Sequence, residues 1–587
     1  MTNPILSMFR QTWLYGRGQR RRLLLTYLLL ILSNLVDLTP PLIFGLLLNR
    51  LQTGGETLAR DVVALLLVNA ALPFFFWMFH GNGRVLELKT SYHVVKNFTD
   101  DMYSKISSLP LAWHKNHHTG DTIDRLRKAA QAIGAFSEET FMIISTLMRF
   151  LVTLTAVTIF APMIGLVSLG ICLIIFATIL WFDKRLIRQI QEVNRRDHAI
   201  ATTLHDYLTN IVTVITLRIE TLSRSVIGQR LRAKYEPYTR QIVFNEVKWF
   251  SISMLLTTMS FLIMSTYILQ LVQAGSLIMI GTVTMLFQYV ERLNYAFFDF
   301  AWQYGTLVRR HTDLKAVNPI LEAYASQTVA DRKESPRTWK KIKISNLNFT
   351  YEDEDQQTQQ LRDIKLTLER GRKLAFVGES GSGKSTLMLI LRGLFSAQQV
   401  QVDIDGWTTS DLRVLSGYTT LIPQDPEIFD NTIEYNITAG IPAREEDVSI
   451  AAEIARFNRV IERLPRGLQT HVMEKGVNLS GGEKQRLALA RGIFAAADSS
   501  LILLDEPTSS VDPVNEVAIY KQLIRHFAGR CLVSSIHKLH LLPLFDRIYV
   551  FSRGCLVEQG SFHDLLLQQG ELSKMWKEYQ VSRHVEG

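Results

Sequence analysis

Long apolar stretches occupy the first half of this sequence and are nearly absent from the second half. Six of them are long enough to cross a bilayer as helices, which takes roughly 20 residues. They lie near 23–48, 62–81, 140–160, 163–183, 250–272 and 276–298. The chain after about residue 300 has the mixed pattern of a water-soluble α/β protein. At 587 residues the chain is also too long for one hydrophobic core. We therefore expect an all-α membrane domain of six helices followed by a soluble α/β domain.

The connections between the six stretches alternate between short and long. Short links (49–61, 161–162 and 273–275) join them in pairs, whereas two connections (82–139 and 184–249) are long, polar and helical in pattern. The basic residues Arg20 to Arg22 precede the first stretch, and such clusters stay on the cytoplasmic side. An even number of spans then places the N-terminus, both long loops and the soluble domain in the cytoplasm. A cleaved signal peptide is disfavoured, because the apolar run is too long and no small-residue cleavage site follows it.

Charge and cysteine content exclude several classes of protein. The net charge of +9 suggests a nucleic-acid partner, but membrane proteins concentrate Lys and Arg in cytoplasmic loops, and no basic stripe interleaved with aromatic residues is present. We therefore expect no nucleic-acid binding. Three widely spaced cysteines (Cys172, Cys531 and Cys555) form no CxxC pair, which favours a reduced compartment over a disulfide framework or a metal site.

Two features of the membrane half leave alternatives open. Ile5, Phe9 and Trp13 recur every four residues, which is typical of a short helix in the membrane interface, although a disordered N-terminus is the other interpretation. Charged residues inside spans are costly. They either line a polar substrate cavity or pair with one another as structural contacts. These charged residues are Asp37, Arg149, Glu291 and Arg292.

A glycine-rich loop in the second half predicts a phosphate-binding site. It follows the apolar run 374–377 and leads into a helical pattern at 387–391, the strand–loop–helix context that a GxxxxGK[ST] motif requires. Its backbone N–H groups and the following helix N-terminus face phosphate charge. Lys384 is placed to reach the β- and γ-phosphates, and the Ser385 hydroxyl to bind Mg²⁺. The loop consists of Gly378, Glu379, Ser380, Gly381, Ser382, Gly383, Lys384, Ser385 and Thr386.

A second apolar run, 501–504, ends in Asp505 and Glu506. A carboxylate at the carboxyl end of a parallel strand beside the phosphate loop is placed to hold Mg²⁺ through water, which is the role expected of Asp505. Glu506 is then the candidate general base that orients and deprotonates the attacking water. The sequence thus predicts a nucleoside-triphosphate hydrolase.

The segment Leu479–Arg486 (LSGGEKQR) resembles the LSGGQ signature of ABC (ATP-binding cassette) transporters, with Glu483 in place of the usual Gln. Small residues at a helix start expose N–H groups and a hydroxyl to an anion. In the family, this segment contacts the γ-phosphate held by the opposite subunit, which implies that Ser480, Gly481 and Gly482 bind ATP across a dimer.

Further segments resemble the family's motifs in the expected order. Tyr351 resembles the aromatic residue that stacks on adenine, and Gln424 the glutamine that senses Mg²⁺ and the attacking water. Asp512, in the segment 509–512, resembles the D-loop aspartate at the dimer seam, and His537 the switch histidine that steadies the γ-phosphate. Glu474 to Gly476 resemble the segment that touches the intracellular loops.

In the membrane half, 109–114 with 118–121 and then 206–214 resemble the two coupling helices of exporter-type half-transporters. Metal binding by His114, His117 and His118 is discounted, because the family carries polar residues here without metal. The resemblance covers essentially the whole chain. It implies a transmembrane domain over 1–325, a linker over 326–340 and an ABC nucleotide-binding P-loop domain with a helical subdomain over 341–587.

The resemblance implies ATP-driven transport by alternating access, with ATP and Mg²⁺ bound between two copies of the chain, although a heterodimer stays open. Export of a lipid, drug or peptide from the cytoplasmic side of a bacterial inner membrane is expected. A siderophore-type importer and a channel regulator that does not pump are the alternatives. No peptidase-like segment precedes the first span, so leader cleavage is not expected. Aromatic residues at 74–77 and at 289–298 suit either an apolar ligand or lipid and helix packing.

Overall fold

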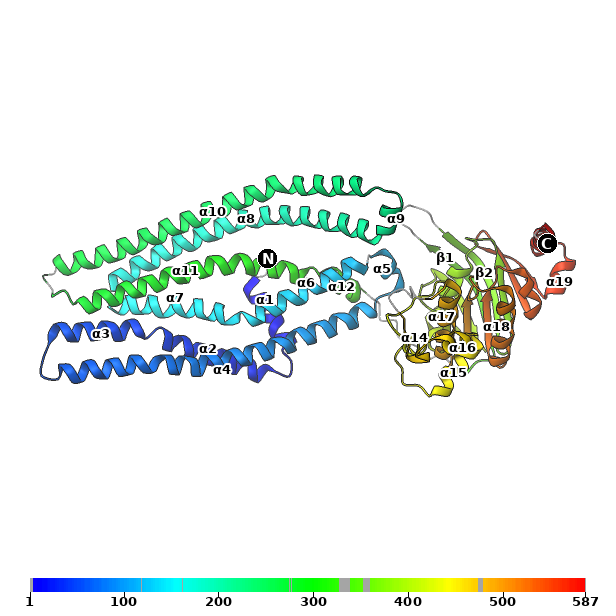
Figure 1. Ribbon diagram of the computed structural model, residues 1–587, viewed down its shortest axis with the longest axis horizontal. Helices are drawn as coiled ribbons and strands as arrows, with labels where there is room; N and C mark the ends of the chain where they lie inside the picture. Colours follow the sequence, from blue (N-terminus) through cyan, green and yellow to red (C-terminus); the bar gives the residue numbers. More distant parts are fainter. Residues whose placement is uncertain are drawn as a thin grey trace. The chain divides into compact units, whose positions relative to one another are not determined.

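The computed structural model describes residues 4–117, 119–160, 162–273, 275, 277–326, 338–351, 359–472 and 479–585. The chain divides into two compact units. One comprises Met1–Leu109 and His117–Ser326, and the other Pro110–Asn116 and Gln327–Gly587. The first is entirely helical in its described part, and the second combines sheets with helices, so the predicted fold class is confirmed (Figure 1).

Several helices of the first unit are much longer than the apolar stretches that predicted them, because the polar loops continue these spans as helix. Helix α4 runs over Leu58–Ser107, α8 over Pro162–Thr209 and α10 over Glu220–Gln273, with α8 and α10 packed along each other (Figure 1). The other helices are α1 (Pro4–Tyr15), α2 (Arg20–Asp37), α3 (Pro40–Thr53), α6 (Thr119–Glu138), α7 (Thr140–Phe160), α9 (Ile211–Thr216), α11 (Ile280–Lys315) and α12 (Asn318–Ala325).

Within the described residues, five helical segments are long and apolar enough to cross a membrane, and they contain the first five predicted spans. The first predicted span is not one continuous helix: α2 ends at Asp37 and α3 begins at Pro40, because Pro40 and Pro41 have no amide hydrogen for the helical ladder. The sixth predicted span, 276–298, overlaps the first part of α11. This helix is less apolar than the five candidate spans, and it packs against α3, α7 and α6. The count of six spans stays a prediction.

Charged side chains of the first unit form ion pairs between helices. Arg292 of α11 lies 3.1 Å from Asp37, and Arg149 of α7 lies 2.6 Å from Asp299. Of the two interpretations of these charges, direct pairing therefore accounts for Asp37, Arg149 and Arg292, whereas Glu291 is exposed.

A third pair lies at the inner ends of predicted spans four and five and is almost fully buried. Lys248 Nζ lies 2.6 Å from Asp183 Oδ1 and donates to the Ala301 carbonyl at 3.2 Å, which joins α8, α10 and α11. This pair was not anticipated from the sequence.

At the N-terminus of the first unit, residues 4–15 form the predicted short helix, α1. Its Phe9 ring packs edge-on against Phe136 and Tyr27. Met8 and Thr12 are buried, whereas Trp13 is 40% exposed. The disordered interpretation is therefore wrong for residues 4–15, and the position of α1 at a membrane interface stays a prediction.

The second unit is built on a six-stranded sheet in the order β12-β11-β3-β10-β9-β6. All neighbours are parallel except β11 and β12. Alternate residues of β9 enter two different apolar clusters, as expected for a strand covered on both faces. The strands are β3 (Lys373–Gly378), β6 (Thr419–Ile422), β9 (Leu501–Asp505), β10 (Cys531–Ser535), β11 (Arg547–Ser552) and β12 (Cys555–Gly560).

A second, antiparallel sheet has the order β2-β1-β4-β5, and β7 (Asn431–Thr432) pairs with β8 (His471–Val472). The antiparallel strands are β1 (Lys341–Tyr351), β2 (Gln359–Glu369), β4 (Gln399–Ile404) and β5 (Trp407–Thr409). The helices of this unit are α5 (Leu111–Asn116), α13 (Lys384–Leu391), α14 (Ile433–Thr438), α15 (Glu445–Ile454), α16 (Asn458–Arg463), α17 (Gly481–Ala495), α18 (Pro513–His526), α19 (Phe562–Leu567) and α20 (Glu571–Val585).

Helix α5, within the first predicted coupling segment, belongs to the second unit. Leu111 and Ala112 pack against its apolar core, and Lys115 Nζ lies 5.4 Å from the centre of the Phe395 ring. Helix α9, within the second predicted coupling segment, belongs to the first unit, where Val212 is 74% exposed.

Candidate nucleotide-hydrolysing site

The phosphate loop connects β3 to α13, as the sequence predicts, and its glycines are required by the backbone. Gly378 has φ 154°, and a Cβ there would lie 2.2 Å from the Phe551 carbonyl oxygen. Gly383 has φ 99°, and a Cβ there would lie 2.5 Å from Leu361 Cδ2. Any other residue would strain or displace the loop at these two positions.

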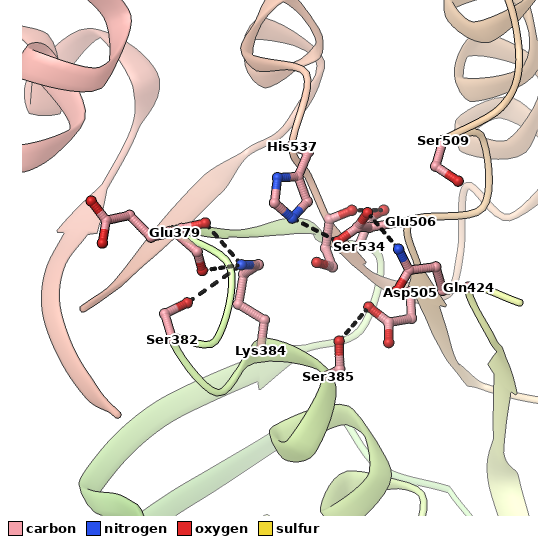
Figure 2. Close-up of polar contacts among 12 residues, drawn as sticks. Glu379, Ser382, Lys384, Ser385, Gln424, Asp505, Glu506, Ser509, Ser534 and His537 are labelled. Carbon is pink, nitrogen blue, oxygen red and sulfur yellow. Dashed lines mark hydrogen bonds and ion pairs between the residues drawn. The ribbon is translucent and has the colours of Figure 1, made fainter. Parts of the chain in front are cut away.

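Lys384, the first residue of α13, is nearly buried and is held by its own loop. Its Nζ donates to the carbonyl oxygens of Gly378 at 2.8 Å and Glu379 at 2.9 Å, and lies 3.4 Å from Ser382 Oγ (Figure 2). Burial lowers the pKa of Lys384, although the carboxylates of Glu506 and Asp505 oppose the shift. A fixed cation is thus available at the mouth of the loop.

Parallel pairing brings the ends of β3, β9 and β10 to one edge of the sheet. Here Ser385 Oγ donates to Asp505 Oδ1 at 3.1 Å, so two oxygen donors of the kind that Mg²⁺ prefers lie together (Figure 2). Burial raises the pKa of Asp505, and the bond from Ser385 and the charge of Lys384 act in the opposite direction. A nearby cation would favour the ionised form of Asp505.

Glu506 is held from both sides. Gln424 Nε2, in the loop after β6, donates to Oε2 at 3.1 Å, and His537 Nε2, after β10, lies 2.7 Å from Oε1 (Figure 2). The backbone of Glu506 has φ 47°, which lies in the left-handed region that residues other than glycine rarely adopt. Burial raises the pKa of Glu506, while the nearby His537 lowers it. A carboxylate with a raised pKa accepts a proton more readily near neutral pH.

The signature segment begins α17. Ser480 caps this helix, and a reciprocal pair of bonds joins it to Glu483: Ser480 N donates to Glu483 Oε2 at 2.9 Å, and Glu483 N donates to Ser480 Oγ at 3.4 Å. Among the described residues, no hydrogen bond or ion pair joins 480–482 to the loop 378–386.

Asp512 caps α18, where its Oδ1 accepts from Asn515 N at 3.0 Å.

Three predicted positions lie outside the described residues: the Tyr351 side chain, Glu474 to Gly476, and His118. The described residues contain no group of three or more His, Cys, Asp or Glu side chains that could hold a metal.

Gln485 is a site residue whose role was not predicted. It is nearly buried in α17 and donates to the Glu506 carbonyl at 3.3 Å and to Ser509 Oγ at 2.7 Å, while its Oε1 accepts from Ser510 N at 2.7 Å. It therefore joins the helix of the signature segment to the backbone of the candidate base. Its position four residues after Gly481 was visible in the sequence, but its burial was not.

Residues 23–297 match the family described as ABC transporter transmembrane region, and residues 361–509 match the family described as ABC transporter. The chain belongs to the ABC transporter superfamily. It is an integral membrane protein that binds and hydrolyses ATP to drive transport.

Two relatives match this ABC transporter over nearly its whole length. ATP-binding cassette sub-family B member 6 of Mus musculus is 29% identical over 97% of this chain and 70% of the relative. The uncharacterized ABC transporter ATP-binding protein YfiC of Bacillus subtilis is 25% identical over 97% of this chain and 93% of the relative. A solved structure of a bacterial Atm1-family ABC exporter with ATP bound shares the fold, with a TM-score of 0.84, 23% identity, and coverage of 96% of this chain and 98% of that one.

Proposed function

We propose that two copies of this chain form a homodimer that exports an amphipathic or hydrophobic substrate, such as a lipid, drug or peptide, by alternating access. The N-terminus and the ATPase domain face the cytoplasm of a bacterial inner membrane in this proposal. The domains are 1–325, a linker 326–340, and 341–587. The observation that carries the hydrolytic part is the Glu506 carboxylate, held between Gln424 at 3.1 Å and His537 at 2.7 Å.

In the proposed reaction, Glu506 takes a proton from water while the water oxygen forms a bond to the γ-phosphorus. The bond from that phosphorus to the bridging oxygen of ADP breaks, and ADP leaves with the electron pair. Lys384 and His537 stabilise charge on the γ-phosphate, and the loop amides of 378–386 hold the phosphates. Tyr351 stacks on adenine, and Ser480, Gly481, Gly482 and Asp512 act at the site of the opposite copy.

Magnesium fits the same edge of the sheet. The Ser385 hydroxyl would bind the ion directly, and Asp505 would hold it through water, with Gln424 also facing it. The 3.1 Å contact between Ser385 Oγ and Asp505 Oδ1 supports this assignment, because the two oxygens are close enough to face the same ion. When bound, the ion neutralises phosphate charge.

Two separate features support the dimer. The signature segment makes no described hydrogen bond or ion pair with the phosphate loop of the same chain, so a second copy would complete each site. The end of α8 and helix α9 also expose an apolar surface, with Leu208 of α8 at 65% and Val212 and Ile215 of α9 at 74% and 59%. Such a surface suits a partner protein surface better than water.

Mixing two inactive variants tests the composite site. Lys384→Ala removes the cation from one phosphate loop, and Ser480→Arg blocks one signature segment. In a mixed dimer, one site carries both changes and the other carries neither, so ATPase activity should reappear at up to half of the wild-type rate per mixed dimer. Each variant alone serves as the control. No recovery on co-reconstitution, with mixed dimers shown by differential tags, would contradict the proposal.

Transport is tested in proteoliposomes with the ATPase domain facing outward. A ligand screen for stimulated ATPase activity identifies candidate substrates, and accumulation of that ligand inside the vesicles on ATP addition would demonstrate export. ATP-dependent loss of preloaded ligand would instead indicate an importer. Turnover without any ligand movement would indicate a regulator.

A further inference from the structure

A carboxylate outside the proposed catalytic site is buried beneath it. Glu516, in the first turn of α18, has an exposed fraction of only 2%. Its Oε1 accepts from the Thr508 hydroxyl at 2.7 Å, two residues after Glu506. A buried carboxylate is costly unless charged or hydrogen-bonding groups surround it, so its neighbours indicate why it is retained.

Lys538 follows the switch residue His537 directly and connects it to the D-loop segment. Its Nζ lies 3.4 Å from Glu516 Oε2 and donates to the Val511 carbonyl at 3.1 Å. It also lies 3.5 Å from the Thr508 carbonyl oxygen. One ammonium group therefore contacts both ends of 508–511 and the buried carboxylate.

His540, in the 3₁₀ turn Leu539–Leu544, extends these contacts to the C-terminal helix α20. Its Nε2 lies 3.4 Å from Glu516 Oε2, and its Nδ1 lies 3.1 Å from the Tyr579 hydroxyl, with the two rings stacked. The Nε2 contact with Glu516 is an ion-pair distance, whereas Nδ1 lies within hydrogen-bonding distance of the phenol, so a tautomer with its proton on Nε2 suits both contacts. Helix α20 itself is anchored by Leu572, which is fully buried in the core.

We propose that Glu516, Lys538, His540 and Tyr579 form a positioning network through which α20 sets the alignment of His537 and of segment 508–512 during ATP hydrolysis. None of the four touches the proposed reacting atoms, so each acts through a neighbour. The proposal rests on the catalytic roles proposed above for His537 and Glu506. Its physical basis is that Lys538 follows His537 directly and Thr508 lies two residues after Glu506, so a shift at Glu516 moves both sides of the site together.

The test compares single substitutions in the full-length, lipid-reconstituted protein. Tyr579→Phe removes only the hydroxyl that bonds His540, and His540→Leu removes both polar contacts. Both should lower kcat by about 3- to 10-fold, the size expected for one lost hydrogen bond, with KM for ATP unchanged. His540→Gln restores a donor and an acceptor and should recover most of the rate. Lys577→Ala, on the exposed face of α20, is the matched control.

Hydrogen exchange separates positioning from general destabilisation. In Tyr579→Phe, amides of 508–512 and 537–541 should exchange faster, while the thermal midpoint and the protection of 571–576 stay at wild-type values. Wild-type kcat, or a lowered kcat without faster exchange at 508–512, would overturn the network. Full turnover by Glu506→Gln would instead overturn the proposed function and leave the contact between α20 and His540 untouched.

Discussion

The imidazole Nε2 of His537 lies 2.7 Å from the carboxylate Oε1 of Glu506. These residues follow neighbouring parallel strands, β10 and β9, so the sheet itself sets their separation. The contact with His537 can therefore orient the Glu506 carboxylate.

Glu506→Gln is expected to bind ATP normally and to lower phosphate release by about 100-fold or more, because an amide cannot accept the proton of the attacking water. The dimer should accumulate in its ATP-bound, closed form. Phosphate release and cross-linking between the two ATPase domains measure these effects. Glu462→Gln, an exposed carboxylate of α16, is the control. Wild-type release by the Glu506 variant would rule out its role as base.

The pH profile of turnover reports on the same residue. Burial raises the pKa of Glu506 above its ordinary value of 4.5. Since a general base acts only when deprotonated, kcat should fall as the pH drops through this raised pKa. The acid midpoint of kcat at saturating ATP should therefore lie above 4.5, and a midpoint at or below that value would argue against burial as the dominant influence.

The buried pair of Lys248 and Asp183 is expected to stabilise the membrane domain only as a pair. Lys248→Met leaves an unpaired buried carboxylate and should cost about 3–5 kcal/mol, whereas the double change with Asp183→Leu should cost much less. Thermal unfolding in detergent measures both. Equal losses in the single and double variants would show that the unpaired Asp183 carboxylate is not the source of the cost.

Helix α9 provides a test of coupling. Val212→Asp places a charge on its most exposed apolar residue and should reduce substrate-stimulated ATPase activity and transport, while basal ATP binding is retained. Val557→Asp, an equally drastic change on exposed β12, is the control. Transport at the wild-type level in the α9 variant would show that the exposed apolar surface of α9 does not couple ATP hydrolysis to transport.

The arrangement of the candidate nucleotide site was largely predictable, because local motifs place its residues at the ends of strands. Loop 378–386 and the pair Asp505 and Glu506 each follow an apolar strand, and parallel strands end at one edge. Gln485 and Glu516 could not be assigned in this way, since their importance comes from burial between segments distant in sequence. In the membrane half, hydropathy located five of the six predicted spans within long apolar helices of the described residues, but not the pairing of Asp183 with Lys248, which depends on helix packing and rotation.

The glutamate in the signature segment has a further consequence. Glu483 forms an ion pair with Arg463 at the end of α16. In the proposed dimer, a carboxylate at this helix start would repel the phosphate held by the opposite copy, and the guanidinium would offset part of that repulsion. In the proposed dimer, nucleotide clamping would therefore draw on Arg463, which lies outside the sequence motifs, and a shift of α16 away from α17 would remove this compensation.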